Sequence, residues 1–352
     1  MPPSMVHVNG SVNLSDAESV MRALAEHVPA LRRIPDGETG ERHLWLAFQE
    51  SRFQDADGLV PVPEADGRLA ELGSHLVRLE TGYDAAEVRF PNLGFASYYL
   101  DSYTIFDRLQ REGAIGLGTR FQVQYPSPLA STASYVDGPD VLAVLPAYER
   151  ALLADLDRVI DGVPARSLAV QWDLPVEIGV LEMPEFFPVS ASLKLEDLAI
   201  AVGRCVDHVP EEIPVGMHLC YGDFEHRHFK EPESLQTQVR FFNAVQASAK
   251  RGVSWCAFTV PQDARAAEFF APLSELDASD AELSFGIVPY HPDRQVPGTT
   301  EDQVSLIDQR LAGRAWGLST ECGLSNVEPD ALPAMLDLHS ELLARLSAPA
   351  DA

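Results

Sequence analysis

Short apolar runs, each followed by proline, glycine or polar residues, recur along the chain at intervals of roughly 30–45 residues. They occupy residues 6–8, 31–35, 119–125, 167–171, 213–220, 253–260 and 283–288. Short runs bounded by turn residues are typical of buried strands. The pattern therefore predicts a series of strands spread over nearly the whole chain.

Between these runs, apolar residues recur at the spacing of an amphipathic helix. Helices are predicted at about 15–27, 140–160, 195–206, 233–249, 300–311 and 329–346. At the start of the first, Ser15 and Glu18 have the spacing of a capping box. Between residues 51 and 100 the pattern is less regular: the apolar spacing of 68–79 is compatible with a helix, and the prolines of 60–63 indicate an irregular excursion.

Alternation of strands and helices is the pattern of repeated βα units. We therefore predict an α/β fold, a single (β/α)8 TIM barrel with some long loops, forming one domain over residues 1–352. A doubly wound open sheet is the alternative, and it lacks the expected G-x-G-x-x-G turn after the first strand.

Composition narrows the choice of partners. Apolar residues make up 46% of the chain, and no uninterrupted apolar run approaches the ~18 residues of a membrane span. The first residues lack the layout of a signal peptide, so a cytoplasmic protein without a membrane partner is expected. The net charge of −27 argues against a nucleic-acid partner, which requires clustered positive charge. The oligomeric state stays open.

Reactive side chains follow the predicted strands. In a barrel, the residues just after the strands gather at one rim. The residues at such positions are Glu38, Asp173, His218, Cys220, His291 and Cys322. A single histidine or cysteine is usually structural. Two thiols and one imidazole at the same rim are better explained by a shared site.

His218 and Cys220 form an H-x-C pair, and alternate residues of a strand share a face. Imidazole and thiolate are ligand types that zinc prefers, and with Cys322 they would leave one position open, as in catalytic zinc sites. Two thiolates and a neutral imidazole would leave Zn²⁺ formally neutral. Such a centre suits binding a substrate thiol as its thiolate better than splitting water.

The segment His218-Leu219-Cys220-Tyr221 resembles the H-x-C-Y segment in the catalytic domain of cobalamin-independent methionine synthases. Residues 319–324, Ser-Thr-Glu-Cys-Gly-Leu, are similar to the P-D-C-G-L segment of that family. Three more segments resemble family motifs in the same order: 36–38 resembles D-G-E, 171–175 resembles Q-x-D-E-P, and 289–292 resembles D-I-H-S.

The resemblance implies a barrel of the uroporphyrinogen-decarboxylase and methionine-synthase superfamily, with His218, Cys220 and Cys322 as zinc ligands. In the family the metal activates homocysteine, whose thiol takes an alkyl group. Asp173 matches the position that recognises the amino-acid part of this substrate. Epoxyalkane:coenzyme M transferases share the barrel and the ligand set, but open an epoxide with a different thiol.

From these observations we predict a zinc-dependent transferase that moves a methyl or other alkyl group to a small-molecule thiol. The second substrate is a methyl donor or a strained electrophile such as an epoxide. Asp173 and Glu38 would orient polar groups of the thiol, with Asp36 and Tyr221 also binding substrate. His291 would protonate or position the electrophile.

The sequence departs from the family at three positions, one of which is the aspartate of D-I-H-S: Pro289 and Tyr290 precede His291 here. Methionine synthases carry a further glutamate ligand at the end of the strand that follows H-x-C. The matching residues here, 254–259, contain none, and Cys256 is a candidate substitute. Leu174 replaces the second acid of Q-x-D-E-P. Folate-dependent methionine synthesis is therefore not expected.

Two other functions remain open, a metal-free lyase or decarboxylase-like barrel and a non-catalytic small-molecule-binding barrel. A second histidine pair, His226 and His228, follows Cys220 closely. Histidines in a charged loop are usually solvated, so this pair is expected to lie in solvent rather than on a metal.

Overall fold

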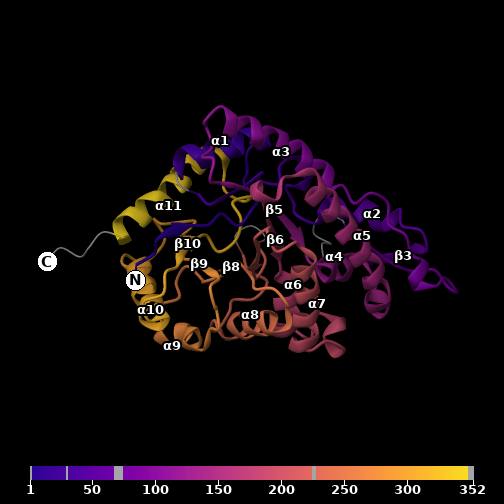
Figure 1. Cartoon of the computed structure of the whole chain (residues 1–352). Coiled ribbons are helices and arrows are strands. Elements are labelled where there is room, and N and C mark those ends of the chain that lie inside the picture. Colours follow the sequence, from indigo (N-terminus) through magenta and orange to yellow (C-terminus); the bar gives the residue numbers. More distant parts are fainter. Residues whose placement is uncertain (1, 29–30, 67–73, 224–226, 348–352) are drawn as a thin grey trace.

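The computed structural model describes residues 2–28, 31–66, 74–223 and 227–347. An eight-stranded parallel sheet lies at its centre (Figure 1). Its strands are β1 (Met5–Val6), β2 (Arg33–Pro35), β5 (Arg120–Pro126), β6 (Leu168–Asp173), β7 (Val215–Leu219), β8 (Trp255–Phe258), β9 (Glu282–Gly286) and β10 (Gly317–Ser319). The order in the sheet is β1-β10-β9-β8-β7-β6-β5-β2, so chain neighbours are sheet neighbours and the first strand meets the last. This is the order of a (β/α)8 barrel, and the predicted fold class is confirmed.

Among the described residues, β1 and β2 do not pair with each other as neighbouring strands. Hydrogen bonds outside the sheet close the barrel between them. The loops that follow them are joined by a hydrogen bond from the Val12 N–H to the Gly37 carbonyl, at 2.9 Å. From β5, the side-chain amide of Gln122 donates to the carbonyl of Val8 at 3.0 Å. These contacts hold the end of β1 against its neighbours.

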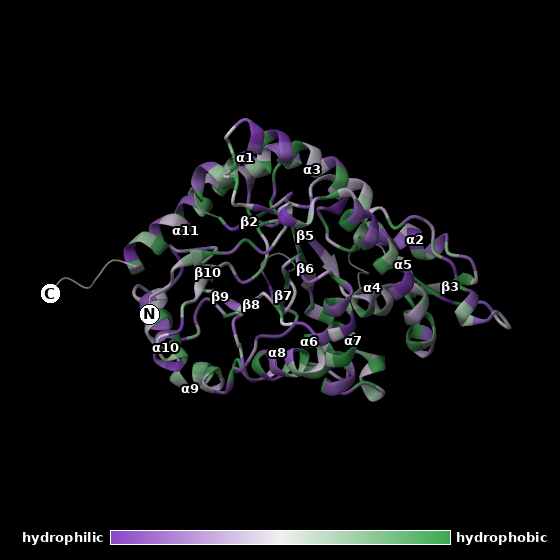
Figure 2. Cartoon of the chain, in the orientation of Figure 1, coloured by the Kyte–Doolittle hydropathy of each residue, from purple (hydrophilic) through white to green (hydrophobic). Residues whose placement is uncertain are grey.

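Helices surround the sheet (Figure 1). The longer ones are α1 (Ala17–His27), α3 (Phe95–Arg111), α5 (Val141–Gly162), α7 (Leu195–His208), α8 (Gln236–Ser248), α10 (Thr299–Leu311) and α11 (Leu332–Ser347). Shorter helices are α2 (Glu50–Gln54), α4 (Pro128–Tyr135), α6 (Pro175–Glu182) and α9 (Ala267–Phe270). The outer helices carry both hydrophobic and hydrophilic residues (Figure 2), as amphipathic helices do. None of the helices among the described residues combines the length and apolar character that crossing a membrane requires.

Outward-facing strand residues pack against the helices, whereas the inside of the barrel is polar. Phe121 of β5, for example, packs on Phe106 of α3, with ring centroids 5.5 Å apart. By contrast, Gln171 of β6 contacts His7 and Trp255, which belong to the β1 and β8 regions. Those strands are not neighbours of β6, so these side chains meet inside the barrel.

Three local predictions are wrong, and the first is the irregular excursion at 60–63, which instead lies within the strand β3 (Leu59–Asp66). Residues 75–79 form a strand, β4 (His75–Leu79), which pairs with β3 (Leu59–Asp66) as an antiparallel hairpin. The apolar spacing was compatible with both a helix and a strand, and pairing with β3 made these residues a strand. Residues 67–73 lie outside the described part. The cap of α1 is Asp16, whose carboxylate accepts from the Ser19 N–H at 2.8 Å, so there is no capping box at Ser15.

Candidate metal centre

The structure brings His218, Cys220 and Cys322 together. Their potential ligand atoms all lie within 4.8 Å of one another, and the two Sγ atoms are 3.3 Å apart. His218 belongs to β7 and Cys220 follows it directly, whereas Cys322 lies in the loop after β10. Since β7 and β10 are not adjacent in the sheet, curling of the sheet into a barrel is what brings the second cysteine to the first.

The charges of this cluster suit metal binding. A hydrogen bond from the Cys322 thiol, with the nearby His218, holds the pKa of Cys220 well below its usual value despite burial. Donation of that hydrogen bond, together with burial, raises the pKa of Cys322. Burial lowers the pKa of His218, but Cys220 and Asp173 outweigh it and raise that pKa to about 10. In the metal-free cluster these contacts favour the thiolate form of Cys220 and the protonated form of His218.

Asp173, the last residue of β6, stands beside the cluster. Its Oδ1 atom lies 3.4 Å from Nδ1 of His218 and accepts a hydrogen bond from Nε2 of Gln171 at 2.9 Å. Burial raises the pKa of Asp173, and the contact with His218 opposes this shift. A carboxylate on the non-ligating nitrogen of a histidine is the usual support of a metal ligand.

Glu38 is a second buried carboxyl group in electrostatic contact with Asp173. It lies in the loop after β2, has a positive φ of 50°, and accepts a hydrogen bond from the Ser11 hydroxyl. Burial and the charge of Asp173 together raise the pKa of Glu38 to about 8. A buried carboxyl group whose pKa is raised by a neighbouring charge is typical of functional sites, although structural networks do the same.

Asp36 is bound on all sides by the protein. It is fully buried and accepts hydrogen bonds from Arg42 Nη2 at 2.7 Å, Ser102 Oγ at 2.8 Å and the Glu38 N–H at 3.0 Å. The guanidinium of Arg42 also lies over the ring of Tyr98, 4.9 Å from its centroid. These contacts fix the loop that carries Glu38, while a role of Asp36 in binding substrate stays a prediction.

The two remaining predicted residues lie on the loops that follow β7 and β9. The hydroxyl of Tyr221 donates to Oε1 of Glu182 at 3.0 Å, and the same carboxylate pairs with Lys230 at 2.9 Å. His291 follows β9, is partly exposed, and its backbone N–H lies 3.4 Å from Oε1 of Gln262. Their proposed roles with substrate stay predictions.

Three polar residues near the cluster were not predicted as part of the site: Tyr290, His228 and Glu321. The hydroxyl of Tyr290 accepts from the Cys322 N–H and donates to the Gly323 carbonyl, both at 2.9 Å. His228 is not solvated as expected: its side chain is 7% exposed, and its Nε2 lies 2.8 Å from a carboxylate oxygen of Glu321. Burial lowers the pKa of His228, but Glu321 outweighs it and raises that pKa to about 9. His226 lies outside the described residues.

Thr259 directly follows β8. Its hydroxyl oxygen is 2.9 Å from the carbonyl oxygens of both Leu219 and Glu321. Cys256 is buried among apolar side chains and is not part of the three-residue cluster. The structure therefore does not support Cys256 as a substitute ligand.

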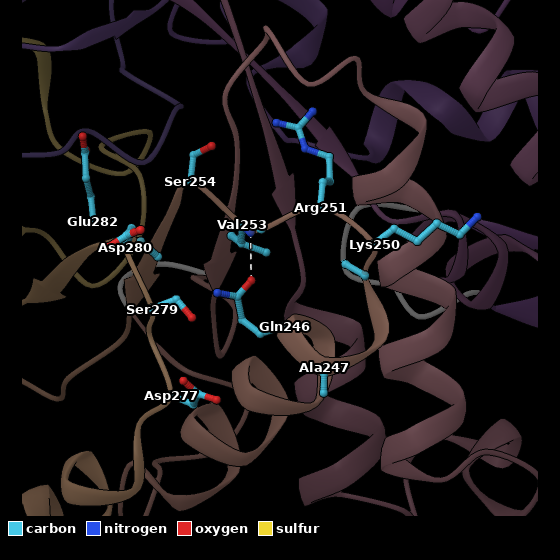
Figure 3. A pocket seen from close by; sticks show the side chains of 13 residues that line it. Gln246, Ala247, Lys250, Arg251, Val253, Ser254, Asp277, Ser279, Asp280 and Glu282 are labelled. Carbon is cyan, nitrogen blue, oxygen red and sulfur yellow. Dashed lines mark hydrogen bonds between the residues drawn. The ribbon is translucent and has the colours of Figure 1, made fainter.

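A separate cavity of about 560 Å³ lies at the other end of the barrel (Figure 3). Its lining comes from residues 246–254 and 277–282, around the starts of β8 and β9. Within it, Oε1 of Gln246 accepts from the Val253 N–H at 2.8 Å. Since the chemistry of α/β barrels lies at the carboxyl ends of the strands, we do not assign this cavity to the reaction.

No family model matches the sequence, and no curated protein matches it. Solved structures match the fold at low identity. A protein provisionally assigned as a vitamin-B12-independent methionine synthase from Listeria monocytogenes matches with TM-score 0.62 and 11% identity, over 99% of each chain. A B12-independent methionine synthase from Shewanella sp. W3-18-1, in complex with selenomethionine, matches with TM-score 0.62 and 11% identity, over 98% of this chain and 97% of that one. A methyltransferase from Methanosarcina mazei matches with TM-score 0.52 and 12% identity, over 99% and 94%. At these identities the likeness shows a shared fold alone.

Proposed function

We propose that the protein is a zinc-dependent transferase that alkylates a small-molecule thiol. The observation that carries the proposal is the convergence of His218, Cys220 and Cys322 within 4.8 Å at the carboxyl ends of the strands. The fold is shared with proteins described as methionine synthases and a methyltransferase, which supports the same class of reaction.

The donor set fits zinc. Two sulfurs and an imidazole nitrogen are soft or borderline ligands that favour zinc over magnesium or calcium, and three of them leave a position for substrate. The lowered pKa of Cys220 favours the thiolate form that a zinc ligand requires. Bound there, zinc would act as a Lewis acid that favours the thiolate form of the substrate at neutral pH.

The surrounding residues would bind and orient the two substrates. Asp173 and Glu38 would hold polar groups of the thiol, and Asp36 would hold the loop of Glu38 in place. The substrate sulfur would form a bond to the alkyl carbon as the bond from that carbon to its donor breaks. His291 would position the donor or protonate the group that leaves. The donor would be a methyl compound or a strained ring such as an epoxide.

A non-catalytic barrel that binds small molecules is the second candidate. It is favoured by the lack of a glutamate in residues 254–259, where Thr259 directs its hydroxyl to backbone carbonyls instead. Only the first candidate predicts an alkylated product.

Metal analysis of the purified protein is the first test, with one zinc per chain expected. Cys220→Ser should lose the metal, whereas Cys205→Ser, which changes a thiol buried in α7, should keep it. Absence of stoichiometric zinc, or an unchanged zinc content in Cys220→Ser, would refute the proposal. In cobalt-substituted protein, a spectral shift on adding small thiols should accompany binding. A shift without any alkylated thiol, tested across methyl donors and epoxides by mass spectrometry, would favour the binding barrel.

A further inference from the structure

Gln171 occupies the centre of the barrel interior, directly beneath Asp173. Its Oε1 atom lies 2.9 Å from Nε2 of His7 and 3.2 Å from Nε1 of Trp255. Its Nε2 atom donates to Oδ1 of Asp173 at 2.9 Å and to the carbonyl of Asn9 at 2.5 Å. The side chain is fully buried, so all four capacities of its amide are satisfied by protein.

These partners fix the orientation of the amide. The Trp255 indole can only donate, and the Asn9 carbonyl can only accept. Turning the amide over would place its oxygen against two acceptors and its nitrogen against a donor, so one orientation is possible. Because Oε1 of Gln171 accepts, His7 must carry its proton on Nε2. Burial, with Arg33 nearby, keeps the pKa of His7 well below its usual value, which agrees with a neutral ring of that form.

The far side of this network is also anchored. The guanidinium of Arg33 lies over the ring of Trp255, 4.2 Å from its centroid, and pairs with Glu282 at 2.7 Å. Trp255 in turn packs against Gly216 of β7, where an added Cβ atom would meet the indole at 2.0 Å. The indole therefore has little freedom to move, and neither does the amide that it contacts.

We propose that Gln171 is a positioning residue that holds the Asp173 carboxylate against Nδ1 of His218, so that Nε2, which here lies 3.3 Å from the Glu321 carbonyl oxygen, is the nitrogen that turns to the metal. The proposal rests on the proposed zinc site. Residues that orient a histidine ligand through a carboxylate change metal affinity without touching the metal, by about 10–100-fold when they are replaced.

Gln122 offers a matched control. It is a glutamine of the neighbouring strand β5, fully buried in the same interior, and its amide donates to the Val8 carbonyl instead of Asp173. Gln171→Met and Gln122→Met thus remove the same group from equally buried positions. If Gln171→Met fails to unfold cooperatively, Gln171→Glu is used in its place. That variant keeps the shape of the side chain and the oxygen that accepts from His7 and Trp255. It replaces the nitrogen that donates to Asp173 with an oxygen.

Zinc affinity is measured by competition with a chelator, and exchange of the His218 Nδ1–H with water is measured by NMR in the metal-free protein. Gln171→Met should bind zinc about 10–100-fold more weakly and lose protection of that proton, whereas Gln122→Met should match the wild type in both. Wild-type values in Gln171→Met, or equal losses in Gln122→Met, would overturn the proposal. A wild-type protein that binds no zinc would overturn the proposed function instead, and the proton-exchange measurement would still decide the role of Gln171.

Discussion

The hydroxyl of Tyr290 bridges the loop of Cys322: it accepts a hydrogen bond from the Cys322 N–H and donates one to the next carbonyl, that of Gly323, each at 2.9 Å. Tyr290 follows β9 and Cys322 follows β10, two strands that pair in the sheet. One buried side chain thus joins two loops at the rim and fixes the backbone from which the second sulfur projects.

Replacing Tyr290 with Phe should weaken zinc binding by about tenfold, because the loop of Cys322 loses its support. It should also lower the free energy of unfolding by about 1–3 kcal/mol, since a buried N–H and a carbonyl lose their partner. Chelator competition and urea unfolding measure the two effects. Tyr135→Phe, which removes a 2.8 Å bond to the Leu46 carbonyl elsewhere, is the control and should affect stability alone. Unchanged zinc affinity in Tyr290→Phe would show that the loop holds its shape unaided.

Arg42→Met should destabilise the protein by about 3–5 kcal/mol, because it leaves the carboxylate of Asp36 buried without its cation. The Arg42 and Asp36 side chains are 3% and 0% exposed. Urea unfolding measures the effect. The comparison variant is Arg204→Met, whose pair with Glu149 is half exposed on the arginine side and should contribute about 0–1 kcal/mol. Similar losses in both variants would contradict this reading of the buried pair.

Glu177→Gln should remove part of the pH dependence of stability. Burial raises the pKa of Glu177 from 4.5 to about 7, so between these values the folded protein holds a proton that the unfolded chain has released. Stability therefore falls as the pH rises through this window and the loss is complete above pH 7. Between pH 5 and pH 8 the wild type should lose about 2–3 kcal/mol more than Glu177→Gln in urea unfolding. Parallel pH profiles for the two proteins would refute the assignment.

Asp173→Asn should lower the pKa of Glu38 from about 8, because it removes the neighbouring negative charge. The pKa should stay above that of an exposed glutamate, since burial is the larger cause of the shift. Carbon-13 NMR of the glutamate carboxyl groups in the metal-free protein measures it. Glu177 serves as an internal control whose pKa near 7 should not move. An unchanged Glu38 would mean that the two carboxyl groups do not interact.

Much of the fold could be read from the sequence because it depends on local periodicity. The runs at 119–125 and 167–171 became β5 and β6 with shifts of one or two residues at their ends. The helix predicted for 68–79 is wrong over residues 75–79, because their spacing suits a helix and a strand alike and pairing with β3 decided the outcome. The capping prediction failed because Ser15 and Asp16 are both suitable N-cap residues, and in the structure the carboxylate of Asp16 caps the helix.

The sequence by itself determined that His218 and Cys220 share a face, because the two-residue period of a strand is local, and that Cys322 follows a strand of the same kind. Tertiary structure decided which side chains support them. The contacts of Gln171 with His7 and Trp255, of Tyr290 with Cys322, and of His228 with Glu321 join residues far apart in the chain. Such pairs depend on how the strands curl and on the path of each loop, which no local pattern of hydrophobic and polar residues encodes.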